Sequence, residues 1–580
     1  MNYEYIVIVS YFLLVIGIGF AFRKMAKNST SDYFRGGGRM LWWMVGSTAF
    51  MAQFSAWTFT GAAGKAFNDG FAISLVFFGN TFAYFCGWAY FSQRFRQMRV
   101  DTPTEGIRRR FGTQNEQFFS WAIIVFSVIN AGVWLNALGV FTSAFFEANI
   151  SVTIIATGLT VLFVSVISGA WGVVASDFIQ TLVIATVSVA CAVVALVAVG
   201  GPVELVTNFR SGFVMGPNMN YGLLLFCTFL FFLPKQLITI MNLNDSYRFL
   251  GARDSANAKK AALLTTVLMG VGSIVFFIPP WATAVLYPNA AEAYADMGGK
   301  AADSVYLIFT QTLMPVGTVG LLVAGLFAAT MSSMDSALNK TAGIFVRSVY
   351  QPWVSRKGGT SNDRRQLQIG KVVSLVNGIL IIFTALFFRS LKDLSLFDLM
   401  MSVTTMIQMP LLIPLMFGMI VKKTPSWAPW VTVALGFSVS WMVANVITAD
   451  VFAAWIGIEE LTRREASELN VVLTIGAHLF ITAAFFCATT LVYREEKDSN
   501  RDETKAFFVD FETPVVVSDD QQSAYDRQQR EKLGLMVIIM GAGMSLMVLI
   551  PNPGWGRLLF AVCSAVILLI GVGLKRSARA

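Results

Sequence analysis

The chain has 580 residues, of which 56% are hydrophobic and only 13% are charged. Soluble domains carry about 25% charged residues, so this composition excludes a soluble globular protein and indicates a polytopic membrane protein. The net charge of +9 does not indicate nucleic-acid binding, because the basic residues fall in short loops between apolar segments, where they set membrane topology.

Membrane-spanning helices need roughly 20 apolar residues, and about fifteen segments approach this length. In chain order they are 4–22, 41–66, 71–95, 117–147, 151–170, 172–200, 220–246, 259–287, 316–346, 366–388, 396–421, 427–447, 470–493, 534–551 and 557–574. We therefore predict an all-α protein with about 13–15 transmembrane helices. The first segment has no basic stretch before it, so it is predicted to be a retained helix and not a signal peptide.

Lys and Arg residues in the loops predict the orientation. They cluster after odd-numbered segments, whereas loops 201–219 and 288–315 hold one each. Basic loops stay in the cytoplasm, which places the N-terminus outside and loop 23–40 inside a cell (inner or plasma) membrane. The charged segment 494–533 is predicted to be a cytoplasmic loop, either partly disordered or an amphipathic surface helix.

Small and polar residues interrupt the second and seventh segments at corresponding places. The interruptions are residues 46–56 and Leu233-Pro234-Lys235-Gln236. Broken helices in matching positions indicate the midplane solute site of a secondary transporter, since only unwound backbone offers carbonyl and amide groups there. The second interrupted helix comes five helices after the first, so the chain divides into two units of five helices. Because five is odd, the second unit crosses the membrane in the opposite orientation to the first.

This spacing predicts a five-plus-five inverted repeat. We assign residues 41–200 to the first repeat and 220–423 to the second. Residues 1–40 would then form an extra N-terminal helix and a cytoplasmic loop, and residues 424–580 would form additional C-terminal helices with the loop at 494–533.

A hydroxyl cluster lies on the ninth segment. Ala329, Ser332, Ser333 and Ser336 have the spacing i, i+3, i+4, i+7 and therefore share one helix face. Two adjacent hydroxyls and a freed carbonyl could supply oxygen ligands to Na⁺. The same serines could instead bond to carbonyls of their own helix or allow close helix packing.

Asp177 is the clearest ionisable residue at membrane depth. An intramembrane carboxylate costs about 2.5–3.5 kcal/mol on insertion scales and indicates a functional site. The alternative is a structural partner for a buried Arg, Lys or backbone amide. Asp335 lies off the serine face, where helix packing or capping explains it as well as an ionic role does.

Lys235 follows Pro234, whose missing amide disrupts a helix. We expect Lys235 to lie beside the solute and to favour one that bears a carboxylate or another anionic group; alternatively it pairs with a protein carboxylate or extends to the interface. Other polar residues could line the cavity or only join helices, namely Gln53, Asn80, Asn130, Asn136 and Gln408. The predicted substrate-binding residues are Gln53, Ser55, Thr58, Lys235, Gln236 and Gln408. The single histidine, His478, is predicted to be structural.

From about residue 30 to 425 the chain resembles the sodium/solute symporter family. The resemblance rests on residues 31–39, Phe54–Trp57, Gly169–Trp171, Ser176–Gln180, Arg248–Ala252 and Ala329–Asn339. It implies a leucine-transporter-like core and a Na⁺ site made by carbonyls of Met51, Phe54 and Ala329 with hydroxyls of Ser332 and Ser333. Where a second Na⁺ is bound, the family implies Asp177 with the same two serines.

Sugar-carrying members of that family place Asn, Tyr and Gln around the solute. The stretch Phe232–Asn242 has no tyrosine, so a glucose-type sugar is not supported. We predict a sodium-coupled symporter that imports a small polar organic solute by alternating access, with no enzymatic activity, organic cofactor or nucleic-acid partner. Two rivals are a transporter-like solute sensor, which would need an appended signalling domain, and a channel, which would need a selectivity loop or a charged ring.

Overall fold

The computed structural model describes residues 2–22, 36–210, 212–358, 362–391, 395–458, 460–495, 500–517 and 519–579. Within these residues the secondary structure is helical and no strand is present. Segment 23–35, with four basic residues of the first predicted loop and the start of the family-like stretch 31–39, lies outside them.

The N-terminal part begins with a helix that precedes the first predicted repeat. Its elements are α1 (Asn2–Phe22), η1 (Gly36–Gly38), α3 (Trp42–Met51), α4 (Ala56–Phe59), α5 (Gly61–Asp69), α6 (Ala72–Cys86), η2 (Gly87–Phe91), α7 (Ser92–Gln97), α8 (Pro103–Phe111), α9 (Thr113–Phe146), α10 (Ile150–Val199) and α11 (Pro202–Thr207).

The middle of the chain corresponds to the second predicted repeat. Its elements are α12 (Gly222–Ile240), α13 (Tyr247–Leu250), α14 (Ser255–Val275), α15 (Ile278–Leu286), η3 (Ala290–Ser304), α16 (Val305–Leu313), α17 (Thr318–Ile344), η4 (Phe345–Tyr350), α18 (Gln351–Arg356), α19 (Asp363–Arg389), α20 (Leu396–Ser402), η5 (Val403–Gln408) and α21 (Met409–Phe417).

The C-terminal part adds further helices around this core. Its elements are α22 (Ala428–Asn445), α23 (Ala449–Trp455), α24 (Arg463–Ala477), η6 (His478–Ala483), α25 (Ala484–Ala488), η7 (Thr489–Val492), α26 (Arg501–Glu512), α27 (Asp519–Ser545), η9 (Leu546–Leu549) and α28 (Gly554–Ser577).

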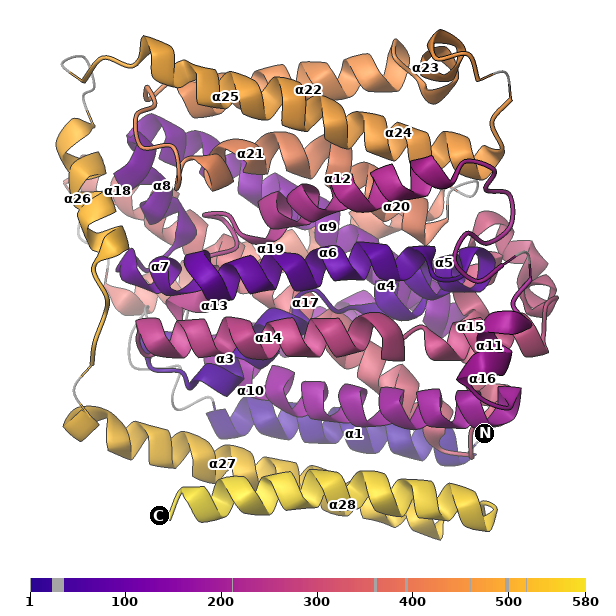
Figure 1. The fold of residues 1–580 in the computed structure, drawn as a ribbon. Coiled ribbons are helices and arrows are strands. Elements are labelled where there is room, and N and C mark those ends of the chain that lie inside the picture. Colours follow the sequence, from indigo (N-terminus) through magenta and orange to yellow (C-terminus); the bar gives the residue numbers. More distant parts are fainter. Residues whose placement is uncertain are drawn as a thin grey trace.

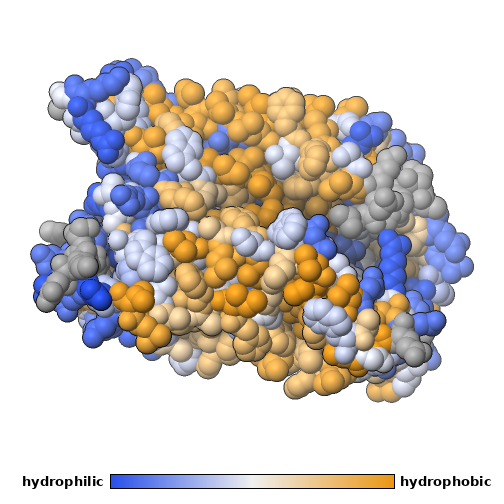
Figure 2. All heavy atoms as spheres, turned by 90° about the horizontal axis from the view of Figure 1, so that it is seen from above, coloured by the Kyte–Doolittle hydropathy of each residue, from blue (hydrophilic) through white to orange (hydrophobic). Residues whose placement is uncertain are grey.

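Long helices run side by side between two ends of the molecule (Figure 1). One end holds α11, α16 and the N-terminus, and we call it the α11 end. The other holds α8, α18 and α26, and we call it the α26 end. An apolar band covers the surface between polar ends (Figure 2), as expected for a protein whose middle faces lipid.

Eleven described helices are long and apolar enough to cross a membrane, and α22 with α23, bent by 74°, would make twelve. The other predicted spans correspond to α1, the broken α3–α5, the first part of α10 and α22. Every segment predicted to span therefore contains helix, and the all-α polytopic fold is confirmed.

The core consists of two groups of four helices. α3, α6, α12 and α14 pack on one another, and α9, α10, α17 and α19 form the second group. Each group draws on both predicted repeats. A Cβ at Gly46 would lie 2.9 Å from the Ala261 carbonyl oxygen, so α3 and α14 approach so closely that only glycine fits there.

The break predicted in the second segment is present between α3 and α4. α3 ends at Met51, and Ser55 has extended backbone with φ −150° and ψ −179°. Ser55 Oγ accepts a hydrogen bond from the backbone N–H of Trp57 at 3.3 Å. A serine at the N-cap starts a new helix in this way, so the sequence itself restarts the helix at Ala56.

Our prediction of a break at Leu233–Gln236 is wrong in position. α12 continues through Pro234 and ends at Ile240, after which Met241 has φ −104° and ψ 68°. A buried helix tolerates proline because neighbouring helices stabilise it. The real break follows at 241–246, where Asn242 Nδ2 donates to the Ile238 carbonyl at 3.0 Å and Asn242 Oδ1 accepts from Asp245 N at 3.1 Å.

In the predicted loop 494–533 the structure places α26 and the start of α27. Phe507, Phe508 and Phe511 of α26 are buried against the protein, so the amphipathic-helix interpretation is confirmed for residues 501–512. Residues 496–499 and 518 of this segment lie outside the described residues.

Candidate functional site

The break between α3 and α4 faces the hydroxyl cluster of α17. Ser333 Oγ donates to the Phe54 carbonyl oxygen at 3.1 Å and lies 3.5 Å from the Met51 carbonyl oxygen. The neighbouring Ser332 Oγ is buried without a hydrogen-bond partner among the described residues. Ala329, which is also buried, lies one turn earlier on α17. These groups are uncharged oxygen donors of the kind that hard cations prefer.

Thr330, next to Ala329, holds α17 against the same break. Its Oγ1 accepts a hydrogen bond from the backbone N–H of Ala56 at 3.1 Å. This contact satisfies one of the N–H groups that the first turn of α4 leaves without a helical partner. Sequence reasoning placed Thr330 in the hydroxyl cluster but did not predict this role.

Asp177 of α10 faces the same pair of elements. Thr48 Oγ1 donates to Asp177 Oδ2, whereas Asp177 Oδ1 has no hydrogen-bond partner within the described part of the chain. Ser332 is close enough to interact with this carboxylate, and Asp335 is a second buried carboxylate within electrostatic range. The tertiary structure therefore places the Asp177 carboxyl group next to the Ser332 hydroxyl.

A central cavity of about 120 Å³ begins at the α3–α4 break and extends toward α13. Five of the six predicted substrate-binding residues line it: Gln53, Ser55, Lys235, Gln236 and Gln408. The sixth, Thr58, is buried and does not line this cavity. Because Ser55 is extended and Thr58 is helical, the two residues do not share a helix face.

Further polar groups enter the cavity from several helices. Gln408 and Thr404 belong to η5, a π-helical segment, and such segments frequently occur at functional sites. Asn80 and Asn130 also line the cavity. Asn136 instead donates to the Ala385 carbonyl at 3.1 Å, so it joins α9 to α19.

Lys235 lines the centre of this cavity. It is buried, with 2% of the residue exposed. Its Nζ lies 3.1 Å from Gln236 Oε1 and 5.4 Å from the centre of the Phe232 ring. Within the described residues no carboxylate forms an ion pair with it. A buried cation without a counter-charge is costly, and this cost distinguishes Lys235 from the other polar groups of the cavity.

An amide chain holds the partner of Lys235 in place. Gln236 Nε2 donates to Asn80 Oδ1 at 2.5 Å, and Thr239 Oγ1 donates to Gln236 Oε1 at 3.0 Å. These contacts join α6 to α12 and direct the Gln236 oxygen toward Lys235. The orientation of Lys235 is therefore set by Gln236, Asn80 and Thr239. Of these three, the sequence analysis associated only Gln236 with the lysine.

Trp57 closes the cavity on the side of the α11 end. Its Nε1 donates to the Leu396 carbonyl at 3.0 Å, and its ring stacks on Phe77 and Phe397 with centroid distances of 6.3 and 6.0 Å. A second cavity of about 870 Å³ lies beyond this layer, between α5, α20 and α24. Two hollows are thus separated by aromatic side chains.

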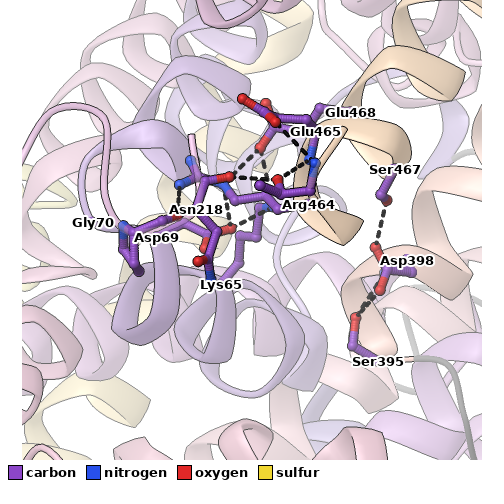
Figure 3. A network of polar contacts seen from close by, with 12 residues as sticks. Lys65, Asp69, Gly70, Asn218, Ser395, Asp398, Arg464, Glu465, Ser467 and Glu468 are labelled. Atoms are coloured by element: carbon purple, nitrogen blue, oxygen red, sulfur yellow. Dashed lines mark hydrogen bonds and ion pairs between the residues drawn. The ribbon is translucent and has the colours of Figure 1, made fainter. Parts of the chain in front are cut away.

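Charged residues of α5 and α24 form a network at the wall of the larger cavity (Figure 3). Lys65 Nζ lies 2.5 Å from Asp69 Oδ2 and 3.2 Å from Glu468 Oε1. Arg464 Nε lies 3.3 Å from oxygens of the same two carboxylates. Two positive and two negative charges alternate, so the network holds α5 against α24 without net charge.

Asp303 of η3 lines the larger cavity too. Burial raises the pKa of its carboxyl to about 7, and a hydrogen bond from the Leu396 N–H at 3.3 Å favours the ionised form. A Cβ at Gly64 would lie 2.8 Å from Asp303 Oδ1. η3 therefore lies directly on α5 and brings an acid that titrates near neutral pH.

The His478 ring lies between two hydroxyl groups. Its ring nitrogens lie 3.2 Å from Ser440 Oγ and 3.1 Å from Thr482 Oγ1. The described residues contain no cluster of His, Cys, Asp and Glu that could hold a metal ion in the manner of zinc sites. These contacts agree with the structural role predicted for His478.

A family model described as the sodium:solute symporter family matches residues 33–428. The sodium/sialic acid symporter of Proteus mirabilis (strain HI4320) is 24% identical over 444 residues, which cover 72% of this chain and 85% of that protein. The sodium/myo-inositol cotransporter of Bos taurus is 25% identical over 406 residues, covering 62% and 55% respectively.

A solved structure supports the architecture. It is the substrate-bound outward-open state of a Na⁺-coupled sialic acid symporter, with a TM-score of 0.63 at 21% identity, and the match covers 85% of this chain and 98% of that chain. At this level of identity the likeness shows a shared fold.

Proposed function

Because the chain belongs to the sodium:solute symporter family, and is thus a sodium-coupled symporter of a small organic solute, we propose that its solute bears a carboxylate or another anionic group. Lys235 carries this proposal, since its ammonium group lines the central cavity without a protein counter-ion among the described residues. The relatives alone do not decide between an acidic and a neutral solute, because sialic acid is acidic and myo-inositol is neutral.

The proposal is tested by uptake into liposomes with an inward Na⁺ gradient. The solutes are sialic acid, pantothenate and proline, with glucose and myo-inositol as neutral compounds. Lys235→Gln should abolish uptake of an acidic solute, and Lys235→Arg, which keeps the charge, should retain part of it. If Lys235→Gln binds the transported solute at full affinity, the solute is neutral and the proposal fails.

The coupling Na⁺ is proposed to bind carbonyl oxygens of Met51, Phe54 and Ala329 with the hydroxyls of Ser332 and Ser333. The distances from Ser333 Oγ to the carbonyl oxygens of Met51 and Phe54 support this assignment. Ser332 Oγ interacts with the Asp177 carboxyl group, and as a hydroxyl oxygen it keeps lone pairs for the ion. No bond of the solute is made or broken, so the protein is not an enzyme, needs no organic cofactor, and should release its solute unchanged.

A second Na⁺ is proposed beside Asp177, with Ser332 and Ser333. Its free carboxylate oxygen at low dielectric attracts a cation strongly. Asp177→Asn should therefore reduce the number of Na⁺ ions carried per solute, as measured from charge and solute fluxes in liposomes. An unchanged stoichiometry together with an unchanged Na⁺ affinity would leave Asp177 a structural hydrogen-bond partner of Thr48.

We propose that the α26 end faces the cytoplasm of an inner or plasma membrane and that the N-terminus is outside. Arg108, Arg109 and Arg110 of α8 and Arg356 of α18 lie at that end (Figure 1), and basic residues remain in the cytoplasm. A protease site added before Asn2 should be cut in intact cells; protection of that site would reverse the assignment.

The repeats are proposed to be residues 41–200 and 220–423, which rock against each other to expose the solute alternately. In these repeats α3 corresponds to α12 and α6 to α14, so the contact of α3 with α14 and the contact of α6 with α12 are equivalent under the repeat symmetry, which supports an inverted repeat. Counterflow of labelled solute separates this carrier from a channel, because only a carrier exchanges solute against an equal outside pool.

A further inference from the structure

A second group of charges lies at the α13 side of the central cavity. Arg248 and Lys340 line the cavity together with Ser333 and Ser336. Ser333, Ser336 and Lys340 have the spacing i, i+3, i+7 and therefore share one face of α17. At 1.5 Å per residue, Lys340 is displaced by about 10 Å from Ser333 along the helix axis, toward the α26 end.

Asp245 is the carboxylate beside these two cations. Arg248 Nη1 lies 3.4 Å from Asp245 Oδ1. The other oxygen of Asp245 accepts from Asn242 Nδ2 at 3.1 Å and from Asn244 Nδ2 at 3.4 Å. Lys340 interacts electrostatically with Asp245 and Arg248 but forms no ion pair in the described part of the chain. Arg248 and Lys340 thus share Asp245 as the adjacent carboxylate, while Asp177 of the proposed sodium site also lies within electrostatic range of Arg248.

Arg248 also retains unused donor capacity, since its Nε is buried and has no hydrogen-bond partner among the described residues. The residue follows the end of α12, whose last five residues separate Lys235 from the break. The cavity therefore has one cation near its centre and two beyond the end of α12. Both lie on the path from the α3–α4 break toward the α26 end.

We propose that Arg248 and Lys340 form a second binding position for the anionic group of the solute, which the carboxylate reaches after it leaves Lys235. This inference rests on the proposed function. A charge leaves a buried lysine slowly unless another favourable position lies within reach, and passage needs sites that bind weakly enough to release. The partial neutralisation of Arg248 by Asp245 makes this second position weaker than an isolated arginine.

A cysteine reporter tests the position without knowledge of the solute. Ser336→Cys is introduced after serine replaces the five native cysteines, Cys86, Cys191, Cys227, Cys487 and Cys563. The rates of modification by two methanethiosulfonate reagents are then compared in detergent-solubilised protein. One reagent carries a sulfonate and the other a trimethylammonium group.

The sulfonate reagent should react faster than the cationic one. Arg248→Gln and Lys340→Gln should each lower this ratio by about threefold or more, because each removes a charge that lines the same cavity as the reporter, in a medium less polar than water. Lys260→Gln is the matched control, since Lys260 is exposed on α14 and does not line the cavity. Equal ratios in all variants would overturn the inference.

Transport kinetics provide a second readout that a merely structural role would not move. With the acidic solute that the wild type takes up from the panel, Lys340→Gln should reduce the maximal rate several-fold and leave the half-saturation concentration unchanged, while Lys340→Arg restores the rate. A raised half-saturation with an unchanged maximal rate would contradict a release role. The two proposals can be refuted separately. If Lys235→Gln binds the solute at full affinity, the proposal of an anionic solute is refuted. If the ratio of the two reagent rates does not change in Arg248→Gln and Lys340→Gln, only the second binding position is refuted.

Discussion

Ser333 is the single residue that joins the two halves of the proposed sodium site. Its hydroxyl contacts the carbonyl of Met51 at the end of α3 and the carbonyl of Phe54 within the break, and Ser332 next to it faces the Asp177 carboxyl group. Ser332→Ala or Ser333→Ala should each raise the Na⁺ concentration for half-maximal uptake by about tenfold to a hundredfold, because a polar contact to a charged group contributes about 1.5–3 kcal/mol. Sodium titration of solute uptake in liposomes measures this.

The control for these two variants is Ser374→Ala. Ser374 is a buried serine of α19 that does not line the central cavity, so its loss tests the general effect of removing a hydroxyl from the helix core. A Na⁺ dependence unchanged in Ser332→Ala and Ser333→Ala, with folded protein in each case, would refute the sodium-site assignment.

Among the elements, α26 has contacts that extend across the α26 end of the molecule. Asp510 Oδ1 lies 2.5 Å from Arg99 Nη1, and Asp510 Oδ2 lies 2.7 Å from Arg109 Nη2. Arg99 follows α7, which packs against α14 of the first helix group, whereas Arg109 belongs to α8, which leads into α9 of the second. One carboxylate therefore connects the first helix group to the second.

Asp510→Asn should loosen this connection. We expect a small loss of stability, about 1 kcal/mol or less because partly exposed ion pairs contribute little, and a several-fold faster modification of Ser336→Cys from the α26 end. Glu512→Gln is the matched control, since Glu512 lies on the same helix and forms its ion pair with the exposed Lys422, at 2.6 Å. If both variants change the modification rate equally, α26 acts as a passive cover and not as a connection between the groups.

At the scale of the whole molecule, the two cavities and the layer between them describe one stage of alternating access. Trp57, Phe77 and Phe397 separate the central cavity from the larger cavity at the α11 end. The network of Lys65, Asp69, Arg464 and Glu468 holds α5 to α24 on the far side of that layer. Passage of solute therefore requires the aromatic layer to open.

Trp57→Ala should connect the two cavities and raise solute leak in the absence of Na⁺ by several-fold while coupled uptake falls. The indole contributes both the stacked ring and the hydrogen bond to Leu396. Trp57→Phe keeps the ring and should leak less than Trp57→Ala. Efflux of labelled solute from preloaded liposomes without Na⁺ measures this, and a tight Trp57→Ala variant would place the barrier elsewhere.

The all-helical membrane architecture and the first break were predictable because they depend on local chemistry. Hydrocarbon requires long apolar helices with satisfied backbone groups, and Ser55 acts as an N-cap within its own segment. The second break was misplaced because Pro234 has a strong intrinsic effect, whereas packing around α12 keeps the helix intact as far as Ile240. The true position of the break could have been recognised from the residues Asn242 to Asp245, since Asn and Asp favour such turns.

The sequence by itself determined an all-helical membrane transporter, the hydroxyl cluster of α17 and the residue types available to a cation and an anion, because membrane burial makes each polar residue conspicuous. Only the tertiary structure decided which of them meet. It paired Thr48 with Asp177, set Gln236 and Asn80 beside Lys235, removed Thr58 from the cavity and placed Arg248 with Lys340. These contacts join residues from different helices, so they follow from how the helices pack and not from the local pattern of any one segment.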